Sequence, residues 1–260
     1  MYKVEHMYWG NAHAVKIFQD KADGEAWRRD LNSLTFLTHP NIVRMFYVIY
    51  ENSDDRSQLR IPIGYVMELM AQSAADLMAE LAAGRFEWTF KQLLNLFEQV
   101  ARALTFAHEN GVIHFDIKPD NILLDESCTV AKLCDFGLAH KLKNASDSAR
   151  SSSSLSAQRR GTVFYMAPET FLKKFEDSPR EQLFLCDIYS FGKTMWQLLH
   201  PTLDVMPGST FEVSADGIPP DLKQIVEQCT QMDFKLRPQK MSLVLDRLQH
   251  VQKQMTAHAS

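Results

Sequence analysis

The sequence predicts an α+β protein of two lobes, a small N-terminal sheet lobe that carries one helix and a larger α-helical C-terminal lobe. Two patterns predict this division. Residues 1–70 hold short apolar runs separated by polar turns, whereas apolar residues recur at helical spacing through most of the chain after residue 75. The length supports both lobes, because 260 residues of which 45% are hydrophobic can form one large or two small cores.

The small lobe is predicted to open with a β-hairpin. Apolar runs on either side of a polar turn indicate two antiparallel strands within residues 2–18. Apolar residues at helical spacing predict one helix over residues 23–38, which ends before Pro40 because proline cannot continue a helix. Two further strands, expected over residues 42–50 and 61–69, complete a small sheet.

The larger lobe is predicted to be mainly helical and to follow a short hinge. Small and polar residues at 71–75 are typical of a hinge, which divides the chain into a partial N-lobe at 1–70 and a C-lobe at 76–255. The expected helices cover residues 75–82, 89–109, 180–199, 219–230 and 241–255. The expected strands cover residues 112–114, 121–124 and 130–134. Seven serines in residues 144–156 predict a mobile segment.

The charge and composition of the chain exclude several classes of protein. The net charge is −4 without a long block of like charges, which argues against a nucleic-acid-binding protein and a polybasic membrane module. No long apolar stretch and no signal-peptide pattern are present, so a cytoplasmic protein is expected, with the nucleus as the alternative. The four cysteines lack metal-ligand spacing and are expected to be reduced thiols.

Residues that carry chemistry are concentrated between His114 and Asn121. A phosphoryl transfer needs a carboxylate that receives the hydroxyl proton, a cation near the moving phosphate, and oxygen ligands for magnesium. These groups are present together in Asp116, Lys118, Asn121 and Asp135. Taken singly, Asp116 could cap a turn, Asn121 could begin a strand and Asp135 could be a solvated loop acid.

Three motifs follow one another in the chain: His114-Phe115-Asp116-Ile117-Lys118-Pro119-Asp120-Asn121, Asp135-Phe136-Gly137 and Ala167-Pro168-Glu169. Their order and spacing resemble the protein kinase family. The resemblance extends over the chain to about residue 250. It implies a bilobal protein-kinase-like fold for a single kinase domain at residues 1–260.

The resemblance also assigns roles to the residues of these motifs. It implies that Asp116 is the catalytic base and that Lys118 stabilises the transferred phosphate. Asn121 is expected both in the catalytic set and as a magnesium ligand. Asp135 is expected to hold magnesium and, through it, the nucleotide.

In the small lobe the resemblance implies an ATP site around Lys16. Lys16 matches the strand lysine that grips the α- and β-phosphates, and Ala14 is expected against the adenine ring. The family's partner for this lysine is a helical glutamate, and Asp30 stands at the matching position, one methylene shorter. Asp30 could instead be an ordinary surface charge beside Arg28 and Arg29.

Residues 66–70 resemble the link between the lobes of a kinase. The resemblance makes Met67 the gatekeeper, although plain core filling would also explain a methionine there. The backbones of Glu68 and Met70 are expected to meet adenine. Leu123 completes the predicted nucleotide-binding residues.

Two features favour serine or threonine as the phosphate acceptor. Lys118 follows Asp116 by two residues, as in serine/threonine kinases and not in tyrosine kinases. Residues 161–169, with Thr162, resemble the substrate-docking loop of serine/threonine kinases. The amino-acid sequence of residues 187–192 is typical of the tyrosine-kinase-like group of serine/threonine kinases.

Two more resemblances concern the scaffold of the large lobe. Asp187 matches the buried aspartate that braces the catalytic loop, and Arg237 matches the arginine that pairs with Glu169. Both roles are structural.

The sequence departs from the family at two places. The G-x-G-x-x-G-x-V loop is absent, and Met1 stands where its closing valine is expected, so we expect the chain to be truncated before Lys16, as an incomplete gene product or a short isoform. Phe115 replaces the arginine that clamps a phosphorylated loop in many kinases, so the serines of residues 144–156 are not expected to switch activity through such a clamp.

The resemblance implies ATP-dependent transfer of the γ-phosphate to serine or threonine hydroxyls of protein substrates. ATP and Mg²⁺ are the expected cofactors, and the expected partner is a protein, not a nucleic acid or a membrane. The alternative is a catalytically impaired kinase-like binding or scaffold module, because the missing loop would leave the phosphates without its backbone N–H groups.

Overall fold

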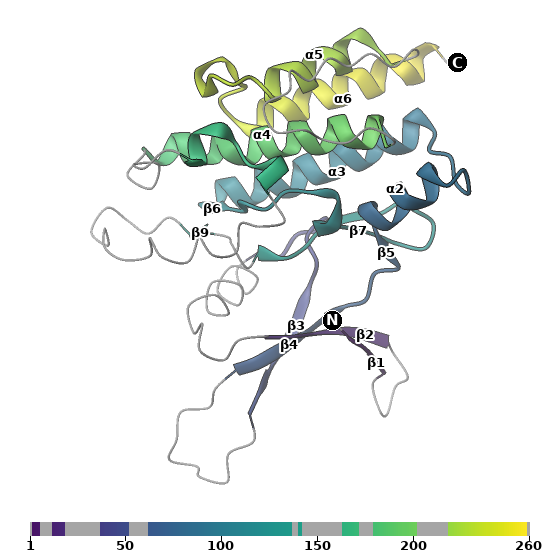
Figure 1. Cartoon of the computed structure of the whole chain (residues 1–260), viewed down its shortest axis with the longest axis vertical. Helices are drawn as coiled ribbons and strands as arrows, with labels where there is room; N and C mark the ends of the chain where they lie inside the picture. Colours follow the sequence, from purple (N-terminus) through teal and green to yellow (C-terminus); the bar gives the residue numbers. More distant parts are fainter. Residues whose placement is uncertain are drawn as a thin grey trace.

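The computed structural model describes residues 2–5, 12–18, 37–51, 62–136, 140–141, 163–171, 179–201 and 218–258. These residues form a sheet lobe and a larger helical lobe, with the C-terminal helix on the side of the helical lobe that lies farthest from the sheet (Figure 1). The α+β fold of two unequal lobes that the sequence predicts is therefore confirmed.

The small lobe is a four-stranded antiparallel sheet. Its strands lie in the order β1-β2-β4-β3 and comprise β1 (Tyr2–Glu5), β2 (Ala12–Ile17), β3 (Met45–Tyr50) and β4 (Pro62–Glu68). Ala14 of β2 lies opposite Met67 of β4. Lys16 lies opposite Tyr65. Because alternate residues of a strand point to the same face, Ala14 and Lys16 share one side of the sheet.

The small lobe differs from the expectation at one strand. The strand predicted from residue 42 begins at Met45. The Val43 N–H donates to Leu133 O at 2.9 Å, and Ile42 forms an isolated bridge with Leu133, so these two residues pair with the other lobe. Of the helix predicted over residues 23–38, residues 23–36 lie outside the described residues, and the described residues 37–38 are not helical.

Five helices are described in the large lobe. They are α2 (Ala74–Ala82), α3 (Phe90–Glu109), α4 (Arg180–Leu199), α5 (Pro220–Cys229) and α6 (Met241–His258). Each was predicted, and each begins within one residue of its predicted start. No helix in the described ranges is long and apolar enough to cross a membrane.

Short strands and 3₁₀ turns connect these helices. One small sheet has the order β5-β7-β8, and a separate pair joins β6 to β9. The strands are β5 (Gln72–Ser73), β6 (Val112–Ile113), β7 (Ile122–Leu124), β8 (Ala131–Leu133) and β9 (His140–Lys141). The 3₁₀ turns are η1 (Pro119–Asn121), η3 (Val163–Tyr165), η4 (Pro168–Phe171) and η6 (Phe234–Leu236).

Helix α3 is the centre of the main core. It begins after Thr89 because Thr89 and Gln92 form a capping box, in which each backbone N–H donates to the other residue's side chain at 2.9 and 3.2 Å. Leu94, Phe97 and Leu104 on its inner face are fully buried. α3 lies against α4 and α6 (Figure 1), and most of the largest apolar cluster lies in the helical lobe, although buried residues of β2 and β4 also belong to it.

A glycine permits the close approach of α4 and α5. A Cβ at Gly192 would lie 2.6 Å from the Cβ of Cys229 and 2.9 Å from Cγ2 of Thr230. Both contacts are shorter than van der Waals contact, so any side chain here would push the two helices apart.

The predicted hinge at residues 71–75 is partly regular structure. Gln72 and Ser73 form β5, α2 begins at Ala74, and the Ala71 N–H donates to Leu124 O at 2.9 Å. Only Leu69 and Met70 lie between the last strand of the small lobe and these contacts. That residues 71–75 act as a hinge between the two lobes stays a prediction.

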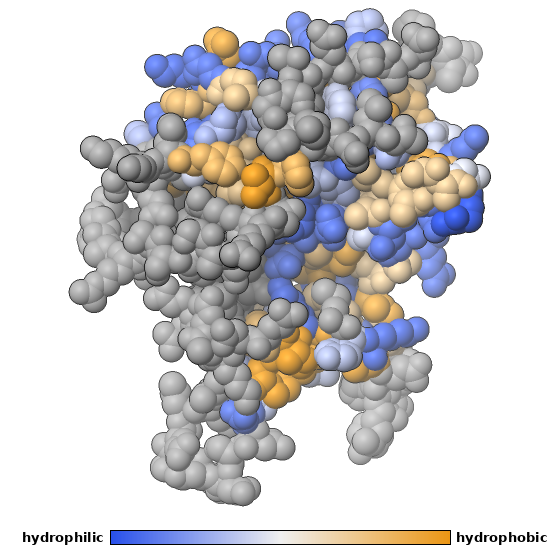
Figure 2. Space-filling view, in the orientation of Figure 1, coloured by the Kyte–Doolittle hydropathy of each residue, from blue (hydrophilic) through white to orange (hydrophobic). Residues whose placement is uncertain are grey.

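The small lobe also exposes apolar surface. Figure 2 shows apolar side chains over β3 and β4. The large apolar side chains that remain exposed on the strands of this sheet are Tyr2, Val4, Ile17, Phe46, Tyr47 and Tyr50.

Candidate active site

Asp116 lies in the loop between β6 and η1 and is 8% exposed. Its Oδ2 accepts a hydrogen bond from Asn121 Nδ2 at 2.9 Å and lies 2.9 Å from Lys118 Nζ. Its Oδ1 is buried and meets no hydrogen-bond donor among the described residues. Because a buried carboxylate oxygen is normally satisfied, Oδ1 is the atom available to receive a proton from a ligand.

The backbone before Asp116 is held by the fully buried carboxylate of Asp187 on α4. Asp187 accepts hydrogen bonds from the N–H groups of His114 and Phe115, both at 2.8 Å. His108 Nε2 on α3 also lies 2.8 Å from this carboxylate. Phe115 has φ +63°, which is uncommon for a residue with a Cβ, and the bonds to Asp187 hold it in that conformation. Two core helices therefore fix the loop.

Asn121 completes the loop. Its Nδ2 donates to the backbone oxygen of Asp116 at 2.7 Å as well as to the carboxylate. Because the amide nitrogen faces Asp116, the amide Oδ1 points to the other side and presents an oxygen acceptor.

The small lobe contributes Lys16 to the same site. Lys16 Nζ lies 2.6 Å from Asp135 Oδ1, and 5.9 Å from the ring centroid of Tyr65 on the neighbouring strand. Asp135 follows β8 and has φ +59°. The structure thus joins the predicted phosphate-binding lysine to the predicted magnesium ligand. Asp30, the lysine partner expected from the sequence, lies outside the described residues.

The oxygen groups of Asp135 and Asn121 suit magnesium. Mg²⁺ prefers oxygen ligands and is commonly held by one or two side chains, with water and substrate phosphates as its other ligands. Within the described ranges no group of three or more histidine, cysteine or acidic side chains could hold a metal ion. The two oxygen groups of Asp135 and Asn121 fit an ion whose other ligands are water and substrate phosphates.

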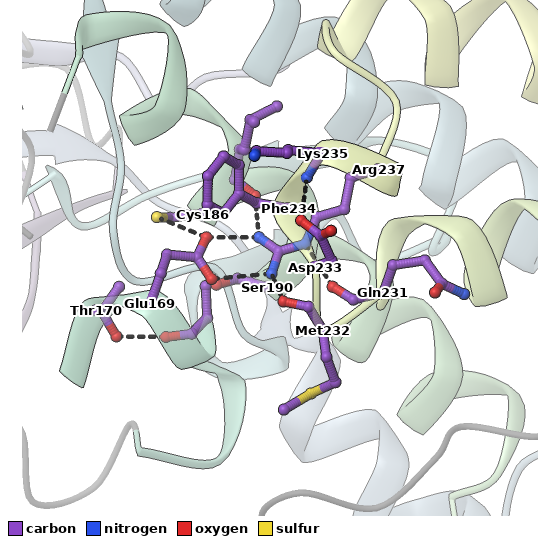
Figure 3. A network of polar contacts seen from close by, with 12 residues as sticks. Glu169, Thr170, Cys186, Ser190, Gln231, Met232, Asp233, Phe234, Lys235 and Arg237 are labelled. Carbon is purple, nitrogen blue, oxygen red and sulfur yellow. Dashed lines mark hydrogen bonds and ion pairs between the residues drawn. The ribbon is translucent and has the colours of Figure 1, made fainter. Parts of the chain in front are cut away.

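A buried ion pair anchors the end of the segment that was predicted as the docking loop, residues 161–169. Figure 3 shows Glu169 of η4 facing Arg237, with the two guanidinium nitrogens at 2.6 and 2.9 Å from its oxygens. Arg237 also donates to three carbonyl oxygens, those of Leu185, Gln231 and Met232. All five guanidinium donors are therefore satisfied, as a buried arginine requires. The predicted pairing of Arg237 with Glu169 is confirmed.

The sequence pattern of the protein kinase domain matches residues 1–250 of the chain. The chain belongs to this family. It is 34% identical to calcium-dependent protein kinase 6 of Plasmodium berghei (strain Anka), over 70% of this chain and 11% of that protein. It is 30% identical to CBL-interacting serine/threonine-protein kinase 15 of Arabidopsis thaliana, over 76% of this chain and 43% of that protein.

The kinase domain is also similar to a putative mitogen-activated protein kinase kinase kinase 7-like protein of Drosophila melanogaster. The identity is 27%, over 86% of this chain and 56% of that protein. The chain thus spans between 11% and 56% of the length of these three relatives.

In this kinase domain the predicted nucleotide-binding residues are divided between the lobes. Ala14 is buried on β2 beside β4, and Glu68 is the last residue of β4. Met70 follows in the link between the lobes. Leu123 lies on β7 and is half-buried against the main core.

The described part of the predicted docking loop, at residues 163–169, is joined to α4. The Tyr165 hydroxyl donates to Gln197 Oε1, and Ser190 Oγ donates to Tyr165 O at 2.7 Å. Burial and the nearby charge of Asp120 raise the pKa of Tyr165, so it stays a neutral donor at neutral pH. Gly137, Thr162 and the serine-rich residues 144–156 lie outside the described residues.

Two polar residues near the kinase site were not expected from the sequence. His108 joins the Asp187 network, and Lys132 of β8 contacts the carboxylate of Glu68. His108 lies on α3, next to Asp187 of α4. Lys132 is the one polar residue in the strand Ala131–Leu133. A polar residue within an otherwise buried short strand was the only signal available for Lys132.

Proposed function

We propose that this chain transfers the γ-phosphate of ATP to serine or threonine hydroxyls of protein substrates. The observation that carries the proposal is the carboxylate of Asp116, which is buried, held through Oδ2 by Lys118 and Asn121, and without a donor at Oδ1 among the described residues. This is the arrangement of a base whose orientation is fixed before the substrate arrives.

Each group then has one task. The acceptor hydroxyl donates its proton to Asp116 Oδ1 while its oxygen forms a bond to the γ-phosphorus, the bond from that phosphorus to the β-phosphate breaks, and ADP leaves. Lys118 places a positive charge beside Asp116, where it stabilises the transferred phosphoryl group. Lys16 binds nucleotide phosphates from the small lobe.

Asn121 Oδ1 and the carboxylate of Asp135 are the oxygen groups that would hold magnesium. When bound, Mg²⁺ neutralises the negative charge that builds on the phosphates. On the adenine side, Ala14 and Leu123 form the apolar walls, and the backbones of Glu68 and Met70 supply the hydrogen bonds. Ser/Thr selectivity is supported by Lys118 two residues after Asp116, and by relatives that are named serine/threonine-protein kinases.

A second candidate function is a kinase-like binding or scaffold module with little activity. It is favoured by one observation, that none of the ten glycines of the chain forms a G-x-G-x-x-G motif. Without such a loop the phosphates lose backbone N–H donors, which weakens binding and transfer.

One experiment separates the two functions. The chain is incubated with Mg²⁺, ATP labelled at the γ-phosphate and a general protein substrate such as casein, and the labelled amino acids are identified after hydrolysis. Phosphoserine or phosphothreonine well above a no-enzyme control supports the kinase. Binding of MgATP in calorimetry without any transfer supports the binding module, and phosphotyrosine alone contradicts the proposed acceptor.

A further inference from the structure

Strand β8 receives contacts from the small lobe on three consecutive residues. The Asn41 amide donates to Ala131 O at 3.0 Å. Lys132 Nζ lies 2.8 and 2.7 Å from the two carboxylate oxygens of Glu68. The Leu133 N–H donates to Asn41 O at 2.8 Å. A single short strand of the large lobe therefore anchors both the connector before β3 and the end of β4.

The Glu68–Lys132 contact is well defined. Both carboxylate oxygens of Glu68 face Lys132, and Oε1 also accepts the Arg44 N–H at 2.6 Å. The Glu68 N–H in turn donates to Arg44 O at 3.0 Å. The side chains of Lys132 and Glu68 are 18% and 21% exposed, so the pair is shielded more than a typical surface pair and is screened less by salt.

The position of this pair links it to the nucleotide site. Lys132 lies three residues before Asp135, which pairs with Lys16 of the small lobe. Glu68 lies two residues before Met70, in the link between the lobes. Two ion pairs therefore join the sheet of the small lobe to the segment of β8 and Asp135. The small lobe supplies the cation in one pair and the carboxylate in the other.

The two pairs differ in what happens to them when nucleotide binds. Lys16 and Asp135 are the groups that the proposed function gives to phosphates and magnesium, so their mutual contact gives way to contacts with the ligand. The side chains of Glu68 and Lys132 face each other and are not assigned to any ligand group. Their contact can persist throughout binding.

We propose that the Glu68–Lys132 ion pair is a positioning device that holds the small lobe on β8 and thereby sets the affinity for MgATP. It fixes the peptide of Glu68, whose backbone is one of the groups that bind adenine in the proposed function. This inference rests on that function. Because adenine is remote from the transferred phosphate, loss of the pair weakens binding more than it slows the chemical step.

The test compares Lys132→Met and Glu68→Gln with the parent chain. Each variant is expected to raise the dissociation constant for MgATP at least fivefold in calorimetry, and Lys132→Met is expected to change kcat at saturating ATP less than twofold. Lys132→Arg, which restores the charge, is expected to recover most of the affinity. The matched control is Arg85→Met, which breaks the exposed Glu80–Arg85 pair and is expected to leave affinity at the parent value.

Amide hydrogen exchange provides a readout that does not depend on nucleotide. The N–H groups of Glu68, Val43 and Leu133, which bond across the junction, are expected to exchange at least tenfold faster in Lys132→Met and at the parent rate in Arg85→Met. If the parent chain itself fails to bind MgATP, the proposed function fails, and exchange alone then decides whether the pair holds the lobes.

Parent-like exchange at these amides in Lys132→Met would overturn the proposal. So would faster exchange with an unchanged dissociation constant in a parent background that binds MgATP, because the pair would then have only a structural role. If Lys132→Met does not fold, Glu68→Asp keeps the charge with a shorter side chain, and an intermediate affinity is expected for it.

Discussion

Lys16 Nζ and Asp135 Oδ1 lie 2.6 Å apart although 119 residues separate them in the chain. One comes from β2 of the small lobe and the other from the segment after β8. Their side chains are 23% and 41% exposed, so the contact is open to water and to ligands. A nucleotide site between two lobes requires a cation that binds phosphate and a carboxylate that binds magnesium. Lys16 and Asp135 can serve as these two groups when they release each other.

Replacing Lys16 with methionine is expected to weaken MgATP binding at least tenfold, because the phosphates lose a cation. The free energy of unfolding should change by no more than about 1 kcal/mol, since partly exposed ion pairs contribute little stability. Calorimetry with MgATP and urea unfolding measure the two quantities. Lys16→Arg, which keeps the charge, should bind with intermediate affinity. Parent-like affinity in Lys16→Met would show that Lys16 is only a strand residue.

Arg237→Lys is expected to lower the free energy of unfolding by about 2–4 kcal/mol. A lysine has three donors at one nitrogen, so it cannot reach both carboxylate oxygens of Glu169 together with three carbonyl groups. The control is Arg247→Lys, whose parent side chain donates to two glutamines on α5 and which should change stability by less than about 1 kcal/mol. Equal urea midpoints for the two variants would contradict the anchoring role.

Lys193 on α4 makes stability depend on pH. Burial lowers its pKa to about 8, and the residue is 2% exposed. Below pH 8 the amine is charged in both states and the folded state bears the full desolvation cost. Between pH 8 and 10.5 the folded state releases its proton first, so the stability of the parent rises through this range.

Lys193→Met removes this dependence. Its stability relative to the parent is expected to be highest near neutral pH and to fall by as much as about 3 kcal/mol on going to pH 10.5, because each pKa unit corresponds to about 1.4 kcal/mol. Urea unfolding of both proteins across this range measures the difference, with Lys253→Met on the exposed face of α6 as the control. A difference that does not change with pH would contradict the assignment.

The sequence predicts elements well where the pattern is long or contiguous. Helix α3 carries apolar residues at helical spacing for twenty residues and a capping box at Thr89, and its predicted bounds differ from the structure by one residue. Asp116, Lys118 and Asn121 lie within six residues of one another, so their convergence follows from a short loop.

Contacts between distant segments could not be predicted in the same way. The Glu68–Lys132 pair joins residues 64 positions apart, with Glu68 at the end of β4 and Lys132 in the middle of β8, and no local sequence pattern connects the two. The polar residues Gln72 and Ser73 predict a hinge, but a two-residue strand shows no alternation, and its pairing with Leu123 and Leu124 is a tertiary effect. The predicted truncation and the predicted membership of the tyrosine-kinase-like group remain predictions.

The most direct test of the kinase mechanism is the phosphate-transfer rate of Asp116→Asn. The change keeps the volume of the side chain and removes the proton acceptor, so transfer to a serine-containing protein should fall at least about hundredfold while the dissociation constant for MgATP stays within about twofold of the parent value. Asp246→Asn, the same change at an exposed position of α6, should leave both quantities unchanged. A transfer rate in Asp116→Asn equal to that of the parent chain would contradict the account.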